Sequence, residues 1–278
     1  MYTAYILMES GRRFDFSYEN GVLFDIKPLT GNSVKVSTSQ GFQQIGDTVE
    51  GMSVSGIKRV ISGTILREEK AKEIISVVTP LSSGSLYVND NRYCDFVVSR
   101  TPELRKDKRG VYLFTMQVHC EFPYWQDPTA VQYLVNGYIP SFSFPVLYDS
   151  HDFGKKTIGG FTNCINSGDV DVPLDCTFFA VDAVTNYGLI NVETQEKIVF
   201  EDVLNAGEKV SVKRASGRVV AQKTTSDGTA GVLAKLTDDS TLLTLRAGDN
   251  VFKAIADEND EHLRVYVNVR PGFSGVIV

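Results

Sequence analysis

The stretch CEFPYWQD, residues 120–127, divides this chain of 278 residues into two halves of different character. The residues that lead into it, 111–121, alternate apolar and polar side chains, which is the pattern of a strand with one buried face. Inside the stretch, a proline restricts the direction of the backbone, and a run of aromatic rings has apolar surface to bury. We interpret Pro123, Tyr124 and Trp125 as a junction that fixes the angle between two β-rich modules.

The first half is predicted to be a β-sheet module with one helix. Residues 68–78 repeat apolar side chains at steps of three and four, which predicts a helix. Glu68 and Glu69 suit the dipole of its first turn, and Pro80 ends it. We expect a barrel-like sheet with this helix packed against it. Period-two alternation predicts half-buried strands at 2–8, 21–26, 33–37 and 58–66, and further strands are expected at 85–88, 91–99 and 111–121.

The second half is predicted to be all β. Its short strands are separated by Gly, Asn and Asp turns at even spacing, which is typical of a β-sandwich or jelly roll. Residues 126–160 are rich in aromatic side chains and contain Pro140 and Pro145, so they are interpreted as largely connecting chain. The expected division is an N-terminal module at 1–135, a connector at 136–159 and a β-sandwich at 160–278.

The composition excludes several classes of protein. A net charge of -6 and a pI near 5.2 argue against a nucleic-acid binder, which needs a basic stripe. No apolar run is long enough to cross a bilayer, and residues 1–9 lack the features of a signal peptide, so we expect synthesis and folding in the cytoplasm. The four cysteines include no C-x-x-C pair and are expected to be buried free thiols, although Cys164 and Cys176 could face each other on paired strands.

No catalytic or cofactor-binding pattern is found. His119, His151 and His262 belong to no H-E-x-x-H motif, and the sequence lacks a nucleophile elbow and a phosphate-binding glycine loop. The acidic clusters at 169–175 and 257–261 fit surface turns better than a calcium loop or a glycosidase carboxylate pair. We therefore expect no enzymatic activity, no cofactor and no metal.

A basic tip is predicted on the hairpin 103–110. It carries Arg105, Lys106, Lys108 and Arg109 in an otherwise acidic protein. Such a tip could dock on an acidic face of an adjoining protein, and the alternative is an ordinary solubilising turn.

Six short motifs occur in one order along the chain: RVISGTI at 59–65, TPL at 79–81, FPYW at 122–125, NSGDVDVP at 166–173, DSTL at 239–242 and AGDN at 247–250. In this order and spacing they resemble the distal tail proteins of long-tailed bacteriophages, and the resemblance covers nearly the whole chain.

The resemblance implies a structural virion protein at the tail tip, made in the cytoplasm of a bacterial host. Distal tail proteins form hexameric rings that join the tail tube to the baseplate. The first module would then be tail-tube-like and form the ring, and the second would be a galectin-like β-sandwich facing outward. The implied partners are further copies of the chain, a tail tube protein, a tail-tip hub protein and a receptor-binding protein.

The alternative function is that of a carbohydrate-binding accessory module of the tail tip, because galectin-like sandwiches often bind glycans. Such sites stack a sugar ring on an exposed aromatic side chain. In the second half, Tyr187 and Phe273 are the aromatic residues expected to be exposed.

Overall fold

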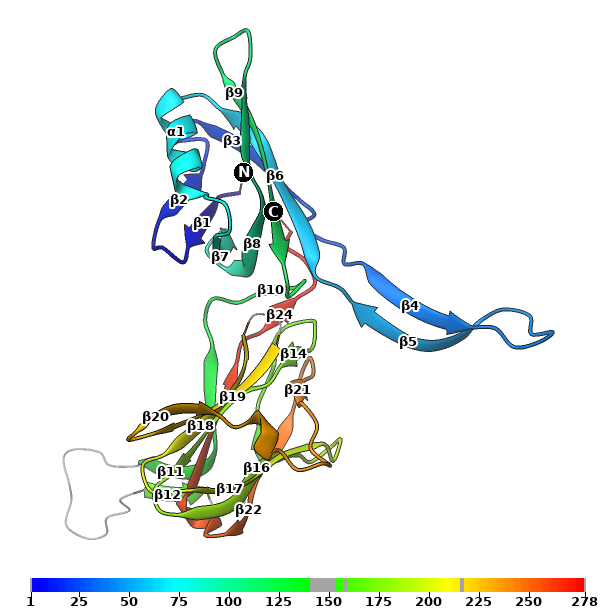
Figure 1. Cartoon of the computed structure of the whole chain (residues 1–278), viewed down its shortest axis with the longest axis vertical. Helices are drawn as coiled ribbons and strands as arrows, with labels where there is room; N and C mark the ends of the chain where they lie inside the picture. Colours follow the sequence, from blue (N-terminus) through cyan, green and yellow to red (C-terminus); the bar gives the residue numbers. More distant parts are fainter. Residues whose placement is uncertain (1, 141–153, 158–159, 216–217, 278) are drawn as a thin grey trace. The chain divides into compact units, whose positions relative to one another are not determined.

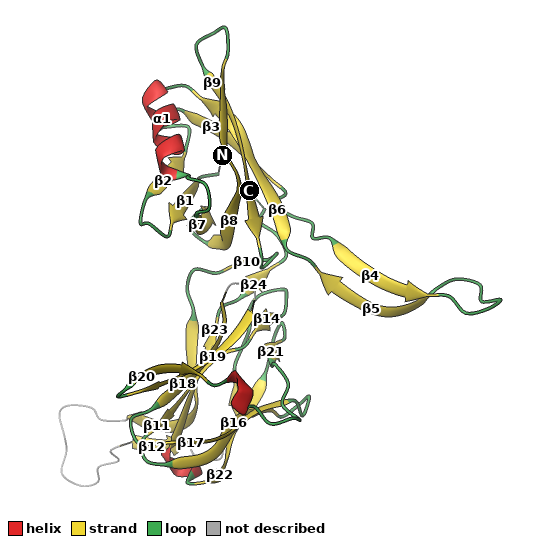
Figure 2. Cartoon of the chain, viewed as in Figure 1, coloured by secondary structure: helices red, strands yellow, loops and turns green. Residues whose placement is uncertain are grey.

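The computed structural model describes residues 2–140, 154–157, 160–215 and 218–277. Within them the chain is built almost entirely of strands, with one α-helix and two short 3-10 helices (Figure 2). The mainly β fold expected from the sequence is confirmed. His151 and most of the expected connector lie outside the described residues.

The strands gather into two compact units. Unit 1 consists of residues 1–128 together with 272–278, and unit 2 consists of residues 129–271. This division differs from the expected one in two places. Residues 131–135 belong to a strand of unit 2, and the last seven residues return to unit 1. Both differences arise from pairing between segments far apart in the sequence, which local patterns do not reveal.

Unit 1 contains one large antiparallel sheet. Its strands are β1 (Ala4–Met8), β2 (Arg13–Phe16), β3 (Val22–Lys27), β6 (Ile57–Ile65), β7 (Ser83–Val88), β8 (Arg92–Lys106), β9 (Tyr112–Cys120), β10 (Trp125–Gln126) and β24 (Gly272–Phe273). The main path runs β2-β1-β7-β8-β9-β6-β3, and β10 joins both β8 and β24. In the described part no pairing connects β2 to β3, so the barrel-like expectation is corrected to an open sheet.

The helix of unit 1, α1 (Glu68–Val77), lies against this sheet (Figure 1). It buries Ala71, Ile74 and Val77, which follow the spacing that predicted it. Their side chains belong to the same apolar cluster as Phe14 and Phe114 of the sheet. Burial of one helix stripe against one sheet face is what stabilises so short a helix in water.

Unit 2 is a β-sandwich of two antiparallel sheets. One sheet has the order β12 (Gly154–Thr157), β11 (Val131–Pro140), β23 (Leu263–Val269), β15 (Asp175–Ala180), β18 (Lys209–Ala215), β19 (Arg218–Thr225) and β20 (Gly228–Gly231). The other has the order β13 (Thr162–Asn163), β22 (Val251–Glu258), β16 (Val184–Asn191) and β17 (Lys197–Leu204). The smaller elements are the pair β14 (Val172–Pro173) and β21 (Thr244–Leu245), with η1 (Leu233–Lys235) and η2 (Asp260–His262).

Aromatic rings join the two sheets of unit 2. Phe178 of β15 lies 5.6 Å from Tyr187 of β16 and 5.9 Å from Phe200 of β17, measured between ring centroids. All three side chains are fully buried. Fully buried apolar residues alternate with half-buried residues along β15 and β23, as the sandwich prediction requires.

Candidate interaction surfaces

A β-hairpin in unit 1 pairs with no other strand of the described chain. It consists of β4 (Val34–Ser39) and β5 (Thr48–Val54), which form a separate two-stranded sheet (Figure 1). Every residue of both strands is exposed. The sequence predicted a half-buried strand at 33–37, so the strand is confirmed and its burial within the chain is wrong.

The hairpin nevertheless has an apolar face. Val34 is paired with Val54, and Val36 is paired with Met52, so these four side chains share one side of the ribbon. The directly opposed Lys35 and Ser53 lie on the other side. The turn between the strands adds two almost fully exposed apolar side chains, Phe42 at 95% and Ile45 at 102%.

An exposed apolar face of this kind is typically buried against another protein surface. A lone two-stranded hairpin is marginally stable in water, and contiguous exposed apolar surface marks sites of protein association. The period-two pattern predicts that this face is buried. Since no part of the described chain buries it, we expect another molecule to do so. The hairpin is the strongest candidate for an interaction surface in the described chain.

The chain that leads into the hairpin is held by two other segments of unit 1. Arg59 donates hydrogen bonds to the carbonyl oxygens of Pro28 and Pro123, the latter at 3.0 Å. Its guanidinium carbon lies 4.2 Å from the centre of the Trp125 ring. The Trp125 Nε1–H donates to the carbonyl oxygen of Leu29 at 3.0 Å. These contacts fix the chain just before it enters β4.

The C-terminal segment completes this support. The backbone N–H of Val276 donates to the carbonyl oxygen of Leu29 at 3.1 Å, and Asn32 Nδ2 donates to the carbonyl oxygen of Ser274 at 3.1 Å. Phe273 lies under the guanidinium of Arg92, 3.6 Å from the ring centre. No sequence signal pointed to this segment, because its partners are far away along the chain.

The expected junction residues lie at the end of the unit 1 sheet. Pro123 and Trp125 are buried, and Tyr124 is half-buried, with Phe122 edge-on at 5.4 Å between ring centroids. Trp125 belongs to the apolar core of unit 1. Their role in setting the angle between the modules stays a prediction.

The basic turn lies at the end of the long β8–β9 hairpin. Arg105 and Lys106 are the last residues of β8, and Lys108 and Arg109 belong to the turn itself. The strand thus extends further into the expected hairpin than the sequence suggested. All four side chains are exposed, so the turn can be reached by a partner.

A row of tyrosines on the unit 1 sheet was missed at the sequence level. Tyr5, Tyr87 and Tyr93 lie directly opposite one another on three adjacent strands. The rings of Tyr5 and Tyr87 stack at 4.6 Å between centroids, and Arg13 lies 3.7 Å over Tyr5. Cross-strand register creates the row, so no local sequence pattern could have revealed it.

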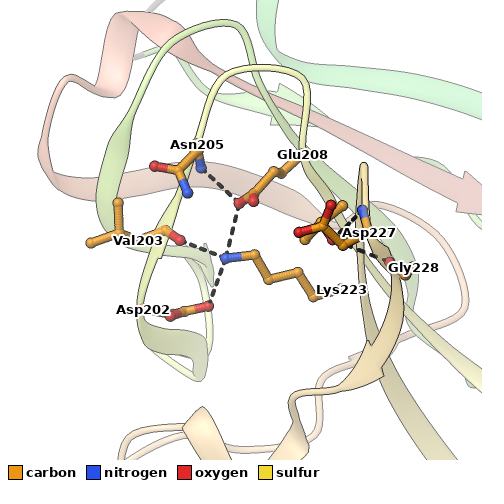
Figure 3. Close-up of polar contacts among 8 residues, drawn as sticks. Asp202, Val203, Asn205, Glu208, Lys223, Asp227 and Gly228 are labelled. Atoms are coloured by element: carbon orange, nitrogen blue, oxygen red, sulfur yellow. Dashed lines mark hydrogen bonds and ion pairs between the residues drawn. The ribbon is translucent and has the colours of Figure 1, made fainter.

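A polar cluster in unit 2 fixes the turn between β17 and β18. The ammonium of Lys223 lies between Asp202 and Glu208, at 3.1 Å and 3.0 Å from their carboxylate oxygens (Figure 3). It also donates to the carbonyl oxygen of Val203 at 2.6 Å, and Glu208 accepts from the Asn205 backbone N–H at 2.9 Å. A lysine that bridges both carboxylates makes this a structural clamp and a poor acid–base pair.

We expect this clamp to make unit 2 sensitive to acid. Burial opposes ionisation of Glu208, but the Asn205 backbone N–H and Lys223 outweigh it and lower the pKa of that carboxyl below its ordinary value of 4.5. A lowered folded-state pKa adds stability above pH 4.5, which is lost as the pH falls through the folded-state pKa. Glu208→Gln should cost about 1 kcal/mol at pH 7. The difference in Tm between Glu208→Gln and the unmodified protein should disappear below pH 4.5.

Thermal unfolding monitored by circular dichroism from pH 7 to pH 3 tests this expectation. The exposed neighbour Glu201, changed to glutamine, is the matched control and should leave Tm unchanged. A Tm difference for Glu208→Gln that stays constant across this pH range would contradict the role assigned to the carboxylate.

The metal and sugar alternatives can be compared with the described residues. These residues contain no group of three or more His, Cys, Asp or Glu side chains that could hold a metal ion. Tyr187, expected to be exposed, is fully buried between the two sheets, and Phe273 lies in unit 1. The aromatic residues suggested for sugar stacking therefore do not form a face on the sandwich. No described helix is both long and apolar enough to span a membrane.

Comparison with known proteins identifies the fold. No family model matches the sequence, and no curated protein matches it significantly. Among solved structures, the chain has the fold of bacteriophage hub and baseplate proteins. One such structure is the Dit protein of phage SPP1, described as a paradigm of the hub adsorption apparatus in phages that infect Gram-positive bacteria. Its TM-score is 0.64 at 11% identity, over 97% of this chain and 99% of that one.

A second group of matches comes from the baseplate of phage P2. The calcium-containing activated conformation gives a TM-score of 0.53 at 9% identity, over 99% of this chain and 100% of that one. The strontium form gives 0.51 at 9% identity with the same coverage of 99% and 100%. The resemblance to distal tail proteins seen in the sequence is thus confirmed at the level of the fold.

Proposed function

We propose that this chain is a structural protein of a bacteriophage tail, a hub subunit that joins the tail tube to the baseplate or tail tip. The observation that carries this proposal is the fold match over 97% of this chain and 99% of the SPP1 Dit chain, which takes in both units. A match of both units in one chain supports a shared architecture far better than a match of one sandwich would, because β-sandwiches serve many unrelated functions.

The proposed assembly is a hexameric ring built by unit 1. A closed ring needs a heterologous interface, in which one surface of a subunit meets a different surface of the next. The hairpin β4–β5 supplies one such surface, and its apolar face would be covered by the neighbouring copy. Ring closure would also cover the free strand edges of the unit 1 sheet, which are otherwise open to aggregation.

The other proposed partners follow from the same role. A hub would contact a tail tube protein on one side and a tail-tip protein on the other, and unit 2 would face outward and carry a receptor-binding protein. Its place would be the tip of the virion tail, after synthesis in the bacterial host. The solved structures that share this fold are hub and baseplate proteins, which favours a non-enzymatic role.

The first experiment is to measure the mass of the purified protein by light scattering after size-exclusion chromatography, with negative-stain imaging of the same fractions. A hexameric mass and rings with an open centre are expected. A chain that stays monomeric even when mixed with its tail tube and tip proteins would contradict the proposal.

We expect the hairpin to control this assembly. Changing both Val36 and Met52 to lysine places two charges on the apolar face and should abolish the ring, because a buried unpaired charge is strongly unfavourable at an interface. The Tm of the monomer should change little, since both side chains are exposed in the free chain. Light scattering and circular dichroism measure the two effects separately.

The matched control places the same two charges on the opposite side of the ribbon. Ser37 and Ser53, both exposed, lie on the polar face and can be changed to lysine. This variant should still form rings. Equal loss of assembly in both variants would show that the hairpin acts through net charge and not through its apolar face.

The basic turn is proposed to dock on an acidic face of an adjoining tail protein. Changing Arg105, Lys106, Lys108 and Arg109 to glutamate should leave Tm unchanged, because all four are exposed. In a phage that lacks its own copy of the protein, we expect complete tails to fall by about tenfold when this variant is supplied. Normal numbers of tails, counted by electron microscopy, would reduce the turn to a solubilising feature.

A further inference from the structure

Two cysteine sulfur atoms meet in the core of unit 1. The Sγ atoms of Cys94 on β8 and Cys120 on β9 are 3.6 Å apart, and both residues are buried. The sequence had suggested Cys164 and Cys176 as the pair that could face each other. In the described chain neither of those two has another cysteine sulfur in hydrogen-bonding contact, and all four cysteines are free.

A buried arginine lies next to this pair. Arg59 is 1% exposed and donates hydrogen bonds to the carbonyl oxygens of Pro28 and Pro123. The Nε of Arg59 has no hydrogen-bond partner, and none of the ion pairs in the described residues includes Arg59. A buried guanidinium without a counter-ion favours negative charge on a neighbouring group. The charge of Arg59 acts on both Cys94 and Cys120.

The two thiols are therefore unequal. The contact with Cys94 lowers the pKa of Cys120, and Arg59 adds to this effect against the opposing influence of burial. Burial raises the pKa of Cys94, which remains a thiol. The negative charge of Asp95 opposes ionisation at both positions. Unequal neighbours of this kind suit a reaction in which one sulfur attacks first and the other follows.

We propose that Cys94 and Cys120 are an oxidisable dithiol, which a small peroxide converts into a disulfide inside unit 1. The Cys120 thiolate attacks one oxygen of hydrogen peroxide, the O–O bond breaks, and sulfenic acid and hydroxide are formed. Cys94 then attacks the sulfenic sulfur, the S–O bond breaks, and water leaves with the thiol proton. Two thiols and one peroxide thus give one disulfide and two waters, with the peroxide reduced.

The change in geometry that the bond needs is a closer approach of the two sulfur atoms. The sulfur atoms must close from 3.6 Å to a bond length of about 2.05 Å. Burial excludes bulky oxidants, so the proposed reagent is hydrogen peroxide, which is small. The bond would join β8 to β9 across 26 residues of sequence and restrict the unfolded chain.

The test uses the unmodified chain, so it does not depend on a variant that fails to fold. Protein purified under reducing conditions is exposed to hydrogen peroxide in its native state, then denatured and titrated for free thiols. We expect the four cysteines to give two free thiols. The intact mass should fall by about 2 Da, and peptide mapping should link Cys94 to Cys120. The Tm of unit 1 should rise by about 5 °C or more and return on reduction.

Two variants serve as matched controls. Cys164→Ala removes a buried thiol of unit 2 and should leave the oxidised link and the rise in Tm intact. Cys94→Ala should abolish both. The proposal is overturned if all four thiols survive peroxide in the native state, if Cys164 and Cys176 oxidise as readily, or if Cys120 gains oxygen without forming a bond to Cys94.

Discussion

Replacing Trp125 with alanine is expected to lower the free energy of unfolding of unit 1 by about 3–5 kcal/mol. The side chain is fully buried in the unit 1 core, and its Nε1–H is bonded to the Leu29 carbonyl oxygen at 3.0 Å. Its removal would leave a cavity and would take from the Leu29 carbonyl oxygen one of its two donors. It would also take away the ring that faces the guanidinium of Arg59 at 4.2 Å.

Urea unfolding followed by far-ultraviolet circular dichroism measures this loss. Fluorescence is unsuitable because Trp125 is the only tryptophan. Phe161→Ala, at an aromatic side chain that is 63% exposed, is the control and should change stability by less than about 0.5 kcal/mol. Trp125→Phe should fall between the two, since it keeps an aromatic ring and loses the hydrogen bond.

The same variant tests the proposed junction. If Trp125 sets the geometry that ring formation needs, Trp125→Ala should weaken the ring even where the monomer remains folded. An unchanged Tm together with normal rings would show that the aromatic cluster neither stabilises unit 1 nor positions its neighbour.

Deleting residues 272–278 is expected to destabilise unit 1 by about 3 kcal/mol, although these residues follow the whole of unit 2 in the sequence. The deletion removes the pairing of β24 with β10, the buried side chain of Val276 and the cover that Phe273 gives to Arg92. It also frees the Leu29 carbonyl from one of its two donors.

A shorter deletion is the matched control. Removing residues 277–278 takes away Ile277, which is 96% exposed, and should leave Tm within about 1 °C of the full chain. Calorimetry of both truncated chains should show the loss in one transition only. A lowered transition for unit 2 with unit 1 unaffected would contradict the structural role given to the C-terminal segment.

The sequence was sufficient where periodicity is local. The apolar spacing of residues 68–78 predicted α1 almost to its ends, and local patterns located most of the longer strands of unit 1 but missed β2 and β5. The sequence was insufficient where partners are distant, as for the two-residue strand β24, whose pairing with Trp125 no local pattern could indicate.

Two errors have particular physical causes. Tyr187 seemed exposed because a glycine follows it, but Gly188 allows close approach of strands, since a Cβ there would lie 2.4 Å from the carbonyl oxygen of Ile198. The apolar face of β4 was read correctly as a pattern. The prediction placed this face against the rest of the same chain, but a sequence does not say which molecule buries it.

The return of the C-terminus has a consequence for how such chains can change. Gln126 and Gly272 are direct partners in the β10–β24 ladder, so the chain leaves unit 1 and re-enters it at adjacent positions. Val131 and Val269, just inside unit 2, are partners as well. Unit 2 is thus a cassette with neighbouring ends, the arrangement in which whole domains can be inserted or exchanged. Replacement of unit 2 as a whole could give the protein a new partner. The sheet, helix and hairpin of unit 1 would not have to change at the same time.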